Sequence, residues 1–122
     1  MAEHRRFMPT FTESPSFEKQ AEALFSEEER EALINHLADD PAAGVLIPDT
    51  GGVRKLRWAA KGQGKRGGAR VIYYYCNLDC PIFLFAAYGK NEKSDLSALE
   101  KKRLRSAVEF IRAKFNSGRN GV

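Results

Sequence analysis

The stretch that most constrains the fold is residues 51–78, GGVRKLRWAAKGQGKRGGARVIYYYCNL, which carries seven Lys or Arg residues and no Asp or Glu. Cationic and apolar side chains alternate along residues 54–59, and β-branched and aromatic residues fill 69–76. Both patterns predict strands, and residues 60–68, with four glycines, predict a long turn. We therefore expect a β-hairpin whose positive charges meet a polyanion, and nucleic acid is the first hypothesis.

The rest of the composition suits one compact domain. The chain has 122 residues, of which 43% are hydrophobic, and a net charge of +4. This length favours a single domain over residues 1–122, with flexible ends at 1–6 and 117–122. No stretch approaches the roughly 20 apolar residues that span a bilayer, and the N-terminus MAEHRRF lacks the apolar core of a signal peptide. We therefore expect a cytoplasmic protein with no membrane contact.

Three helices are predicted from capping signals and apolar spacing. Ser14 and Pro15 begin the first, and Ser26 with Glu29 forms a capping box for the second, which ends near residues 39–41. These two helices should be antiparallel. Another capping box, Ser97 with Glu100, begins a long terminal helix that is expected to end near residue 118.

Strands are predicted around these helices. Residues 7–11 form a short strand restricted to an edge by Pro9, residues 41–53 form an extended connector, and residues 82–88 form a strand that follows the hairpin. The predicted fold class is therefore α+β, with a small, mostly antiparallel sheet packed against two N-terminal helices and a C-terminal helix.

Several familiar catalytic groups have weak support. The two histidines, His4 and His36, are distant in sequence from the basic hairpin, and His36 has the pattern of a helix surface residue. Cys76 and Cys80 have no second pair or nearby histidine to complete a zinc site, so we expect no metal and no cofactor. A disulfide between Cys76 and Cys80 under oxidising conditions remains an alternative. The glycines do not form a phosphate-binding motif between a strand and a helix.

The cations on the predicted strands are the remaining candidates for chemistry. Lys55 and Arg57 share one face by alternation, Arg70 lies across the hairpin, and Lys90 and Lys93 follow the last strand. RNA cleavage by its own 2′-hydroxyl requires a base, stabilisation of the phosphate and a proton donor. A lysine crowded by positive charges is a plausible base, and guanidinium groups bind phosphate. Simple nucleic-acid binding by the same face is the alternative.

Other residues are better suited to holding RNA than to chemistry. Lys61, Lys65 and Arg66 lie on the glycine-rich turn, and Arg54 belongs to the same basic hairpin. Phosphate contacts from such cations supply much of the non-specific affinity for nucleic acid. Tyr88 is a further RNA-binding candidate, and we expect at least one of the tyrosines at 73–75 to be exposed for base stacking. Trp58 should be in the core.

The combination of GGVRKLRWAAKGQGKRGGARVIYYY and AAYGKNEKSDLS resembles the HigB-type branch of the RelE/ParE toxin superfamily. The resemblance extends over most of the chain, and the predicted order of elements agrees with a RelE-like fold. It implies an endoribonuclease that cleaves mRNA in the ribosomal A site without a metal, and thereby inhibits translation.

The resemblance also implies roles for individual residues. Lys55 and Arg57 match the base and the phosphate stabiliser, in an order that stays open, and Arg70 matches the residue that holds the scissile phosphate. Lys90 and Lys93 match the cationic segment after the last strand. The chain departs from the RelE pattern at Asn91, where arginine is common, and at Ser97, near a catalytic tyrosine of some relatives. Tyr88 and Lys93 are then the candidates for the general acid.

Partners follow from the resemblance alone. It implies a cognate helix-turn-helix antitoxin, the ribosome and mRNA, and operator DNA bound through the toxin-antitoxin complex. The antitoxin either covers the basic face or binds the helical side. Two other functions remain as alternatives: a ParE-like inhibitor of DNA gyrase that is not a nuclease, and a plain nucleic-acid-binding module.

Overall fold

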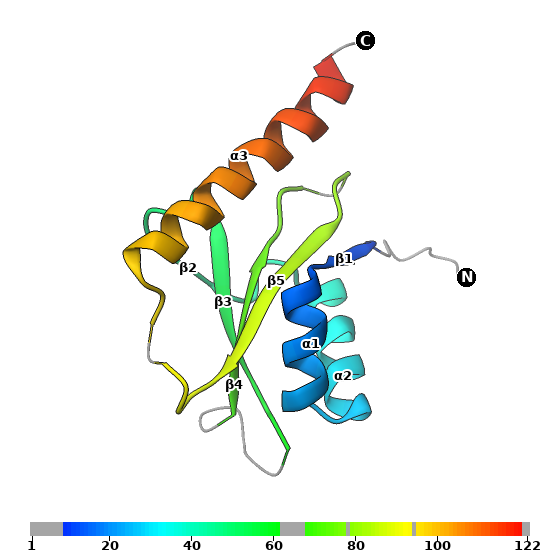
Figure 1. The fold of residues 1–122 in the computed structure, drawn as a ribbon. Coiled ribbons are helices and arrows are strands. Elements are labelled where there is room, and N and C mark those ends of the chain that lie inside the picture. The colour runs from blue at the N-terminus through cyan, green and yellow to red at the C-terminus, as the bar shows by residue number, and fades with distance from the viewer. Residues whose placement is uncertain (1–8, 62–67, 78, 94, 121–122) are drawn as a thin grey trace, which may run out of the picture.

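The computed structural model describes residues 9–61, 68–77, 79–93 and 95–120, with side chains described as far as residue 115. Within these residues, three helices and a five-stranded sheet make up the fold (Figure 1). In chain order the elements are β1 (Phe11–Glu13), α1 (Pro15–Leu24), α2 (Glu27–Asp39), β2 (Val45–Leu46), β3 (Val53–Trp58), β4 (Ala69–Tyr74), β5 (Ile82–Gly89) and α3 (Ala98–Asn120).

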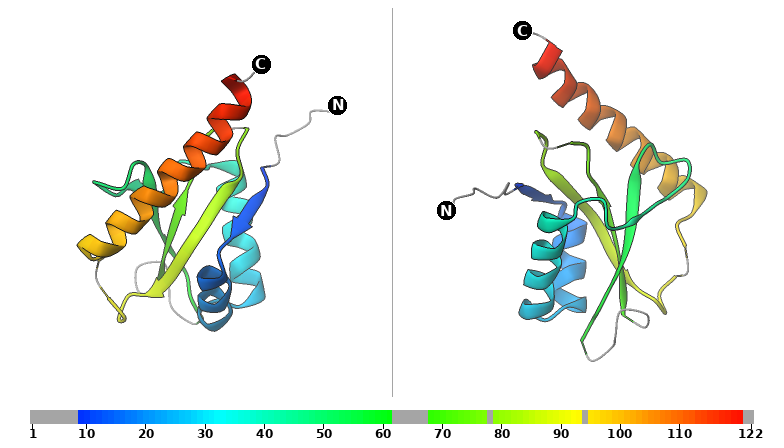
Figure 2. Two further views of the ribbon diagram at one scale, coloured as in Figure 1. Left: turned by 45° about the horizontal axis from the view of Figure 1, so that its top comes forward. Right: turned by 180° about the vertical axis from the view of Figure 1, so that it is seen from behind.

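The sheet has the order β1-β5-β4-β3-β2. The strand β1 pairs in parallel with β5, and the other neighbours are antiparallel. The predicted α+β class and the mostly antiparallel sheet are therefore confirmed. Figure 2 shows α1 and α2 on one face of the sheet and α3 on the other.

Local capping explains where the first two helices begin. The Phe17 amide donates to Ser14 Oγ at 3.0 Å, and this hydroxyl also donates to the Phe85 carbonyl at 2.7 Å, which ties the start of α1 to β5. At α2 the amides of Ser26 and Glu29 each donate to the other residue's side chain, at 2.9 and 3.1 Å. These reciprocal bonds satisfy amides that a helix start leaves unpaired, so both predicted N-termini are confirmed.

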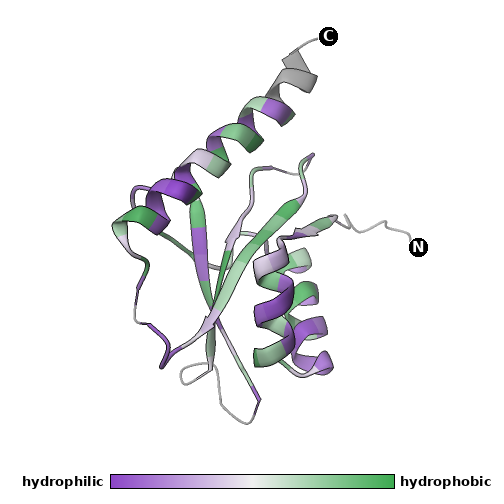
Figure 3. Cartoon of the chain, viewed as in Figure 1, coloured by the Kyte–Doolittle hydropathy of each residue, from purple (hydrophilic) through white to green (hydrophobic). Residues whose placement is uncertain are grey.

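Two apolar layers hold the elements together. The first lies between the sheet and the α1–α2 pair and includes Phe17, Leu33, Leu37 and Trp58. The second lies under α3 and includes Val53, Ile72 and Val108. Figure 3 shows hydrophilic and hydrophobic residues on all three helices, as expected for helices with one buried side. Trp58 is 7% exposed, so its predicted place in the core is confirmed.

Some boundaries differ from the sequence-based predictions. The first strand is Phe11–Glu13 instead of residues 7–11, because its pairing with Ile82–Leu84 begins only at Phe11. The predicted connector contains β2, a two-residue edge strand paired with Arg54 and Lys55. Such a short strand has no alternating pattern to detect. The helix α3 continues to Asn120, past Gly118.

The tyrosine run is more buried than predicted. Tyr73 and Tyr74 are buried, and Tyr75 is partly buried against the core under α1 and α2. The expected exposed tyrosine is therefore wrong, because Tyr73 and Tyr75 pack in the layer under α1 and α2 and Tyr74 packs in the layer under α3. The Tyr73 hydroxyl donates to the Pro41 carbonyl at 2.8 Å and accepts from the Gly44 amide at 2.8 Å. This hydroxyl thus attaches the segment between α2 and β2 to the middle of the sheet.

The two cysteines are free thiols at the β4–β5 turn, and Cys80 is buried. Burial, together with its neighbour Cys76, raises the pKa of Cys80 to about 12. The reactive species is the thiolate. At pH 8 we therefore expect iodoacetamide to modify Cys80 about 10³-fold more slowly in the native protein than in denaturant, where the thiol pKa returns to about 8.5. Peptide mass spectrometry over time measures this, and equal rates in both states would contradict it.

Candidate RNA-binding and catalytic face

Lys55, Arg57 and Arg70 lie on the sheet face that also carries α3. Alternation along β3 puts Lys55 and Arg57 on the same side as Val53, which packs under α3. Arg57 is the direct cross-strand partner of Arg70, and Lys55 is that of Ile72. Paired residues of antiparallel strands have Cα atoms about 5 Å apart. Lys55 and Arg57 therefore share a face as predicted, and Arg70 lies across the hairpin from Arg57.

This part of the face lies away from the body of α3. The helix packs near the start of β3, where a Cβ on Gly51 would be 3.3 Å from Val108 Cγ1, whereas Lys55 lies in the middle of the strand and Arg57 next to its last residue. Arg57 is exposed, and the Lys55 side chain is 31% exposed. A negatively charged ligand can therefore reach them.

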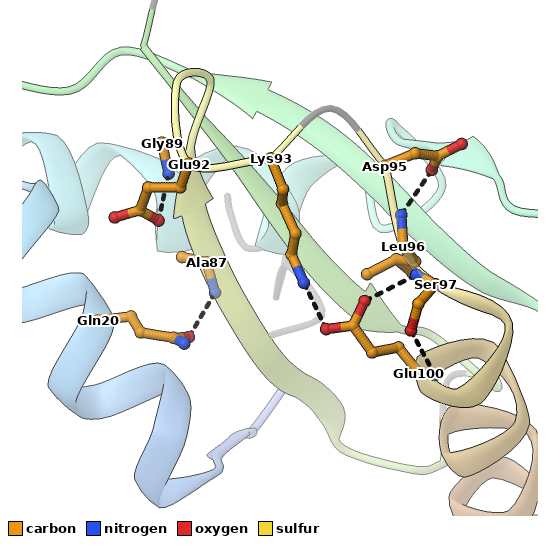
Figure 4. Close-up of polar contacts among 9 residues, drawn as sticks. All are labelled: Gln20, Ala87, Gly89, Glu92, Lys93, Asp95, Leu96, Ser97 and Glu100. Carbon is orange, nitrogen blue, oxygen red and sulfur yellow. Dashed lines mark hydrogen bonds and ion pairs between the residues drawn. The ribbon is translucent and has the colours of Figure 1, made fainter.

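The segment between β5 and α3 brings acidic residues to the same place. Asp95 Oδ1 lies 3.9 Å from Lys55 Nζ, and Glu100 forms an ion pair with Lys93. Figure 4 shows the Lys93 side chain extending over β5 toward Glu100, while Glu100 also accepts from the Ser97 amide at the start of α3. These contacts hold the pKa of Glu100 below its usual value, the Lys93 hydrogen bond being the largest cause. We call Lys55, Arg57 and Arg70 the cation set; Asp95 is the carboxylate partner of Lys55 in this set, and Glu100 is that of Lys93 beside it.

Tyr88 lies on β5 beside Arg70 and Lys93. It pairs with Arg70 across β4 and β5, and Lys93 Nζ is 5.2 Å from the centre of its ring. Burial raises the pKa of Tyr88, and Asp95 and Glu100 add to the effect while Arg70 opposes it. Its hydroxyl is buried without a hydrogen-bond partner among the described residues. The phenol is therefore neutral near pH 7, and the ring, with 4% of the residue exposed, is packed in the layer under α3.

The remaining predicted RNA contacts lie elsewhere. Arg54 points to the opposite face of the sheet and donates to the carbonyls of Ala42 and Gly44. Lys61 lines a cavity of about 250 Å³ at the end of the sheet, and its Nζ donates to the Ala23 carbonyl. Lys90, which was predicted with the cations for chemistry, lines this same cavity, whereas Lys55, Arg57 and Arg70 do not. Lys65 and Arg66 are outside the described residues. The structure thus separates Arg54 from the cation set.

Sequence reasoning missed Asp95 as a site residue and recognised Glu100 only as a helix cap. The available signal was that Asp95 and Glu100 follow Lys93 closely in the segment KNEKSDLSALE, which holds three acids and two lysines. In the parts of the chain that the structure describes, no group of three or more His, Cys, Asp or Glu residues could hold a metal ion. The same parts include no helix long and apolar enough to cross a membrane.

A comparison with protein families supports the relationship suggested by the motifs. The model described as "RelE toxin of RelE / RelB toxin-antitoxin system" matches residues 42–117, which is more than half of the chain. The matched region contains β2 to β5 and most of α3, and so includes the whole cation set and its acidic partners. The protein therefore belongs to the RelE family of toxins of toxin-antitoxin systems.

Proposed function

We propose that the protein is a ribosome-dependent mRNA endonuclease of the HigB type, which inhibits translation by cleaving mRNA in the A site. The observation that carries this proposal is the placement of Lys55, Arg57 and Arg70 on neighbouring strands of one accessible face. Three fixed cations around one point suit a phosphate whose negative charge increases during the reaction.

The phosphate is held by the two arginines in this proposal. Arg57 and Arg70 are cross-strand partners, so their guanidinium groups can approach the same phosphate from adjacent strands. Arginine forms two parallel hydrogen bonds with phosphate oxygens and stays charged. Lys55, on the same face, adds a third positive charge beside Asp95.

The proton transfers are assigned to the β5–α3 segment. The 2′-oxygen attacks the adjacent phosphorus, and Asp95 takes its proton, because a carboxylate is the group beside Lys55 that can accept one. The bond from phosphorus to the 5′-oxygen breaks, and that oxygen takes a proton from Lys93. The products are a 2′,3′-cyclic phosphate and a 5′-hydroxyl, so the reaction consumes no water, and none of these steps requires a metal ion.

Replacing Asp95 by asparagine should slow cleavage about 10²-fold, because the amide keeps the shape of the side chain but cannot accept the proton. The rate is measured on translating ribosomes with a message of known sequence. Glu92→Gln is the matched control, since Glu92 lies in the same segment and bonds to the Gly89 amide. Equal rates for Asp95→Asn and the wild type would exclude Asp95 as the base.

The function itself is tested with purified components. Folded wild-type protein is added to translating ribosomes and, separately, to DNA gyrase in a supercoiling assay. We expect cut mRNA with a 2′,3′-cyclic phosphate end, loss of cutting in Lys55→Ala, and normal supercoiling. Intact mRNA with inhibited gyrase would support the ParE-like alternative. Intact mRNA with salt-sensitive RNA binding would support a plain binding module.

Membership of the RelE family implies an antitoxin partner. We propose that this antitoxin is a helix-turn-helix protein and that the complex binds operator DNA. Lys61 and Lys90, which line one cavity, are proposed to hold the RNA backbone together with Lys65 and Arg66. Lys61 follows the end of β3, where it could extend the phosphate track from Arg57. We further propose that the protein acts in the cytoplasm, where its ribosomal target is found.

A further inference from the structure

A second cavity lies beside the cation set, at Tyr88 and Lys93, and reaches past β5 to α1. It has a volume of about 430 Å³ and lies between α1, β5 and the first half of α3. Its apolar wall includes Ile72, Phe85 and Leu104. Tyr88 and Lys93 line this cavity as well, and Tyr88 is the cross-strand partner of Arg70. The cavity is therefore next to the place proposed for the phosphate, with Tyr88 as the wall nearest Arg70.

We infer that this cavity binds the nucleobase of a nucleotide next to the scissile phosphate, and that its best ligand is guanine. This inference rests on the proposed function. From Tyr88 to Ala86 the strand advances about 7 Å, so one nucleotide can put its phosphate near Arg70 and its base beside Phe85. The volume falls within the range of small-ligand pockets. An aromatic and apolar wall suits the flat face of a base.

Polar groups at the edge of the cavity favour guanine over the other bases. Arg103 lines the cavity one helical turn from Glu100, so a cation and a carboxylate are adjacent there. Guanine has acceptors at O6 and N7, which arginine contacts in pairs. It also has hydrogen-bond donors at N1 and N2, and a carboxylate can accept hydrogen bonds from both. Adenine, cytosine and uracil each lack part of this pattern.

Gln20 supplies a further donor on the α1 side. Its side-chain oxygen accepts from the Ala87 amide at 2.8 Å (Figure 4), which directs the oxygen toward β5 and leaves the amide NH₂ for another acceptor. Gln20 also lines the cavity. The ion pair of Lys93 with Glu100 lies at the boundary with the cation set. Lys93 can therefore contact either the base or the phosphate of a bound nucleotide.

The pocket is tested without the ribosome. The four nucleoside 3′,5′-bisphosphates are titrated into isotope-labelled protein, and backbone amide shifts are followed by NMR. We expect saturable shifts at Phe85, Leu104 and Ala107, at least fivefold tighter for the guanosine compound. Shifts confined to the cation set, or equal affinities for all four, would overturn the inference.

Two variants separate the pocket from the general attraction of phosphate. Ala107→Phe fills the cavity and should weaken guanosine binding at least tenfold, while Ala113→Phe, on the exposed side of α3, should not. Arg103→Ala, at an exposed residue that cannot disturb the core, should reduce the guanosine preference to below twofold. An unchanged preference in both pocket variants would overturn the inference. So would loss of antitoxin binding by Ala107→Phe with unchanged nucleotide shifts, since the cavity would then bind protein.

The experiments distinguish a wrong assignment of the guanine pocket from a wrong proposal of nuclease function. Wild-type protein that cuts mRNA on ribosomes but shows no pocket shifts would refute the pocket alone. Protein that binds the guanosine compound in the pocket but leaves ribosome-bound mRNA intact would refute the nuclease alone. If both hold, Ala107→Phe should cut messages with a changed preference for guanine next to the cleavage site.

Discussion

Replacing Arg70 by alanine should slow mRNA cleavage on translating ribosomes about 10³-fold. Its guanidinium is proposed to hold the scissile phosphate with Arg57, its cross-strand partner, and removal of one preorganised donor from a transition state costs about 10²–10³ in rate. The loss should be largely in kcat, because the negative charge on the phosphate is greatest in the transition state. Arg70→Lys should recover only part of the rate, since an ammonium lacks the paired hydrogen bonds.

The control for Arg70 is an arginine outside the site. Arg112 is exposed on α3, so Arg112→Ala removes the same charge from the molecule without touching the cation set. Thermal unfolding checks that each variant is folded. A folded Arg70→Ala variant that cuts as fast as Arg112→Ala would remove Arg70 from the mechanism.

Replacing Tyr73 by phenylalanine should lower the free energy of unfolding by about 2–4 kcal/mol, because two backbone groups lose their partner and an unpaired buried group costs about 1–3 kcal/mol. The Tyr73 side chain is fully buried, and its hydroxyl bonds to the Gly44 amide and the Pro41 carbonyl. This is a large share of the 5–15 kcal/mol typical of a domain. Urea denaturation measures the change.

The neighbouring tyrosine provides the comparison. Tyr75→Phe removes the same hydroxyl from a partly exposed position on the same run, so we expect a change below about 0.5 kcal/mol. An equal loss of unfolding free energy in both variants would show that the hydrogen bonds of the Tyr73 hydroxyl to Gly44 and Pro41 do not account for the effect. Burial raises the pKa of Tyr73 above that of a free tyrosine, so its hydroxyl is protonated and can donate a hydrogen bond at neutral pH.

The cation set could be predicted because it depends on local geometry. Side chains alternate along any strand, so Lys55 and Arg57 had to share a face, and the hairpin made Arg70 their neighbour. The helix starts at Ser14 and Ser26 were predictable for the same reason, since capping involves residues three positions apart.

The carboxylates could not be predicted in the same way. The contact between Asp95 and Lys55 joins residues that are distant in sequence, and it depends on how the segment after β5 folds back over the sheet. The burial of Tyr88 depends likewise on Lys93 and on α3. The strand β2 was missed because two residues carry no periodic signal. The alternation of residues along the strands thus predicted where the cations lie, whereas their carboxylate partners depend on contacts between segments that are distant in sequence.

The parallel pairing of β1 with β5 affects how the protein is made. Ser14 and Phe85, which are hydrogen-bonded, are 71 residues apart in the chain, so β1 and α1 leave the ribosome long before their partner strand exists. The strands β3, β4 and β5 pair with sequence neighbours, and such local contacts form faster than distant ones. The newborn chain should therefore assemble its basic hairpin early and complete its N-terminal layer last. Until then the apolar side of α1 and α2 is available to chaperones and proteases.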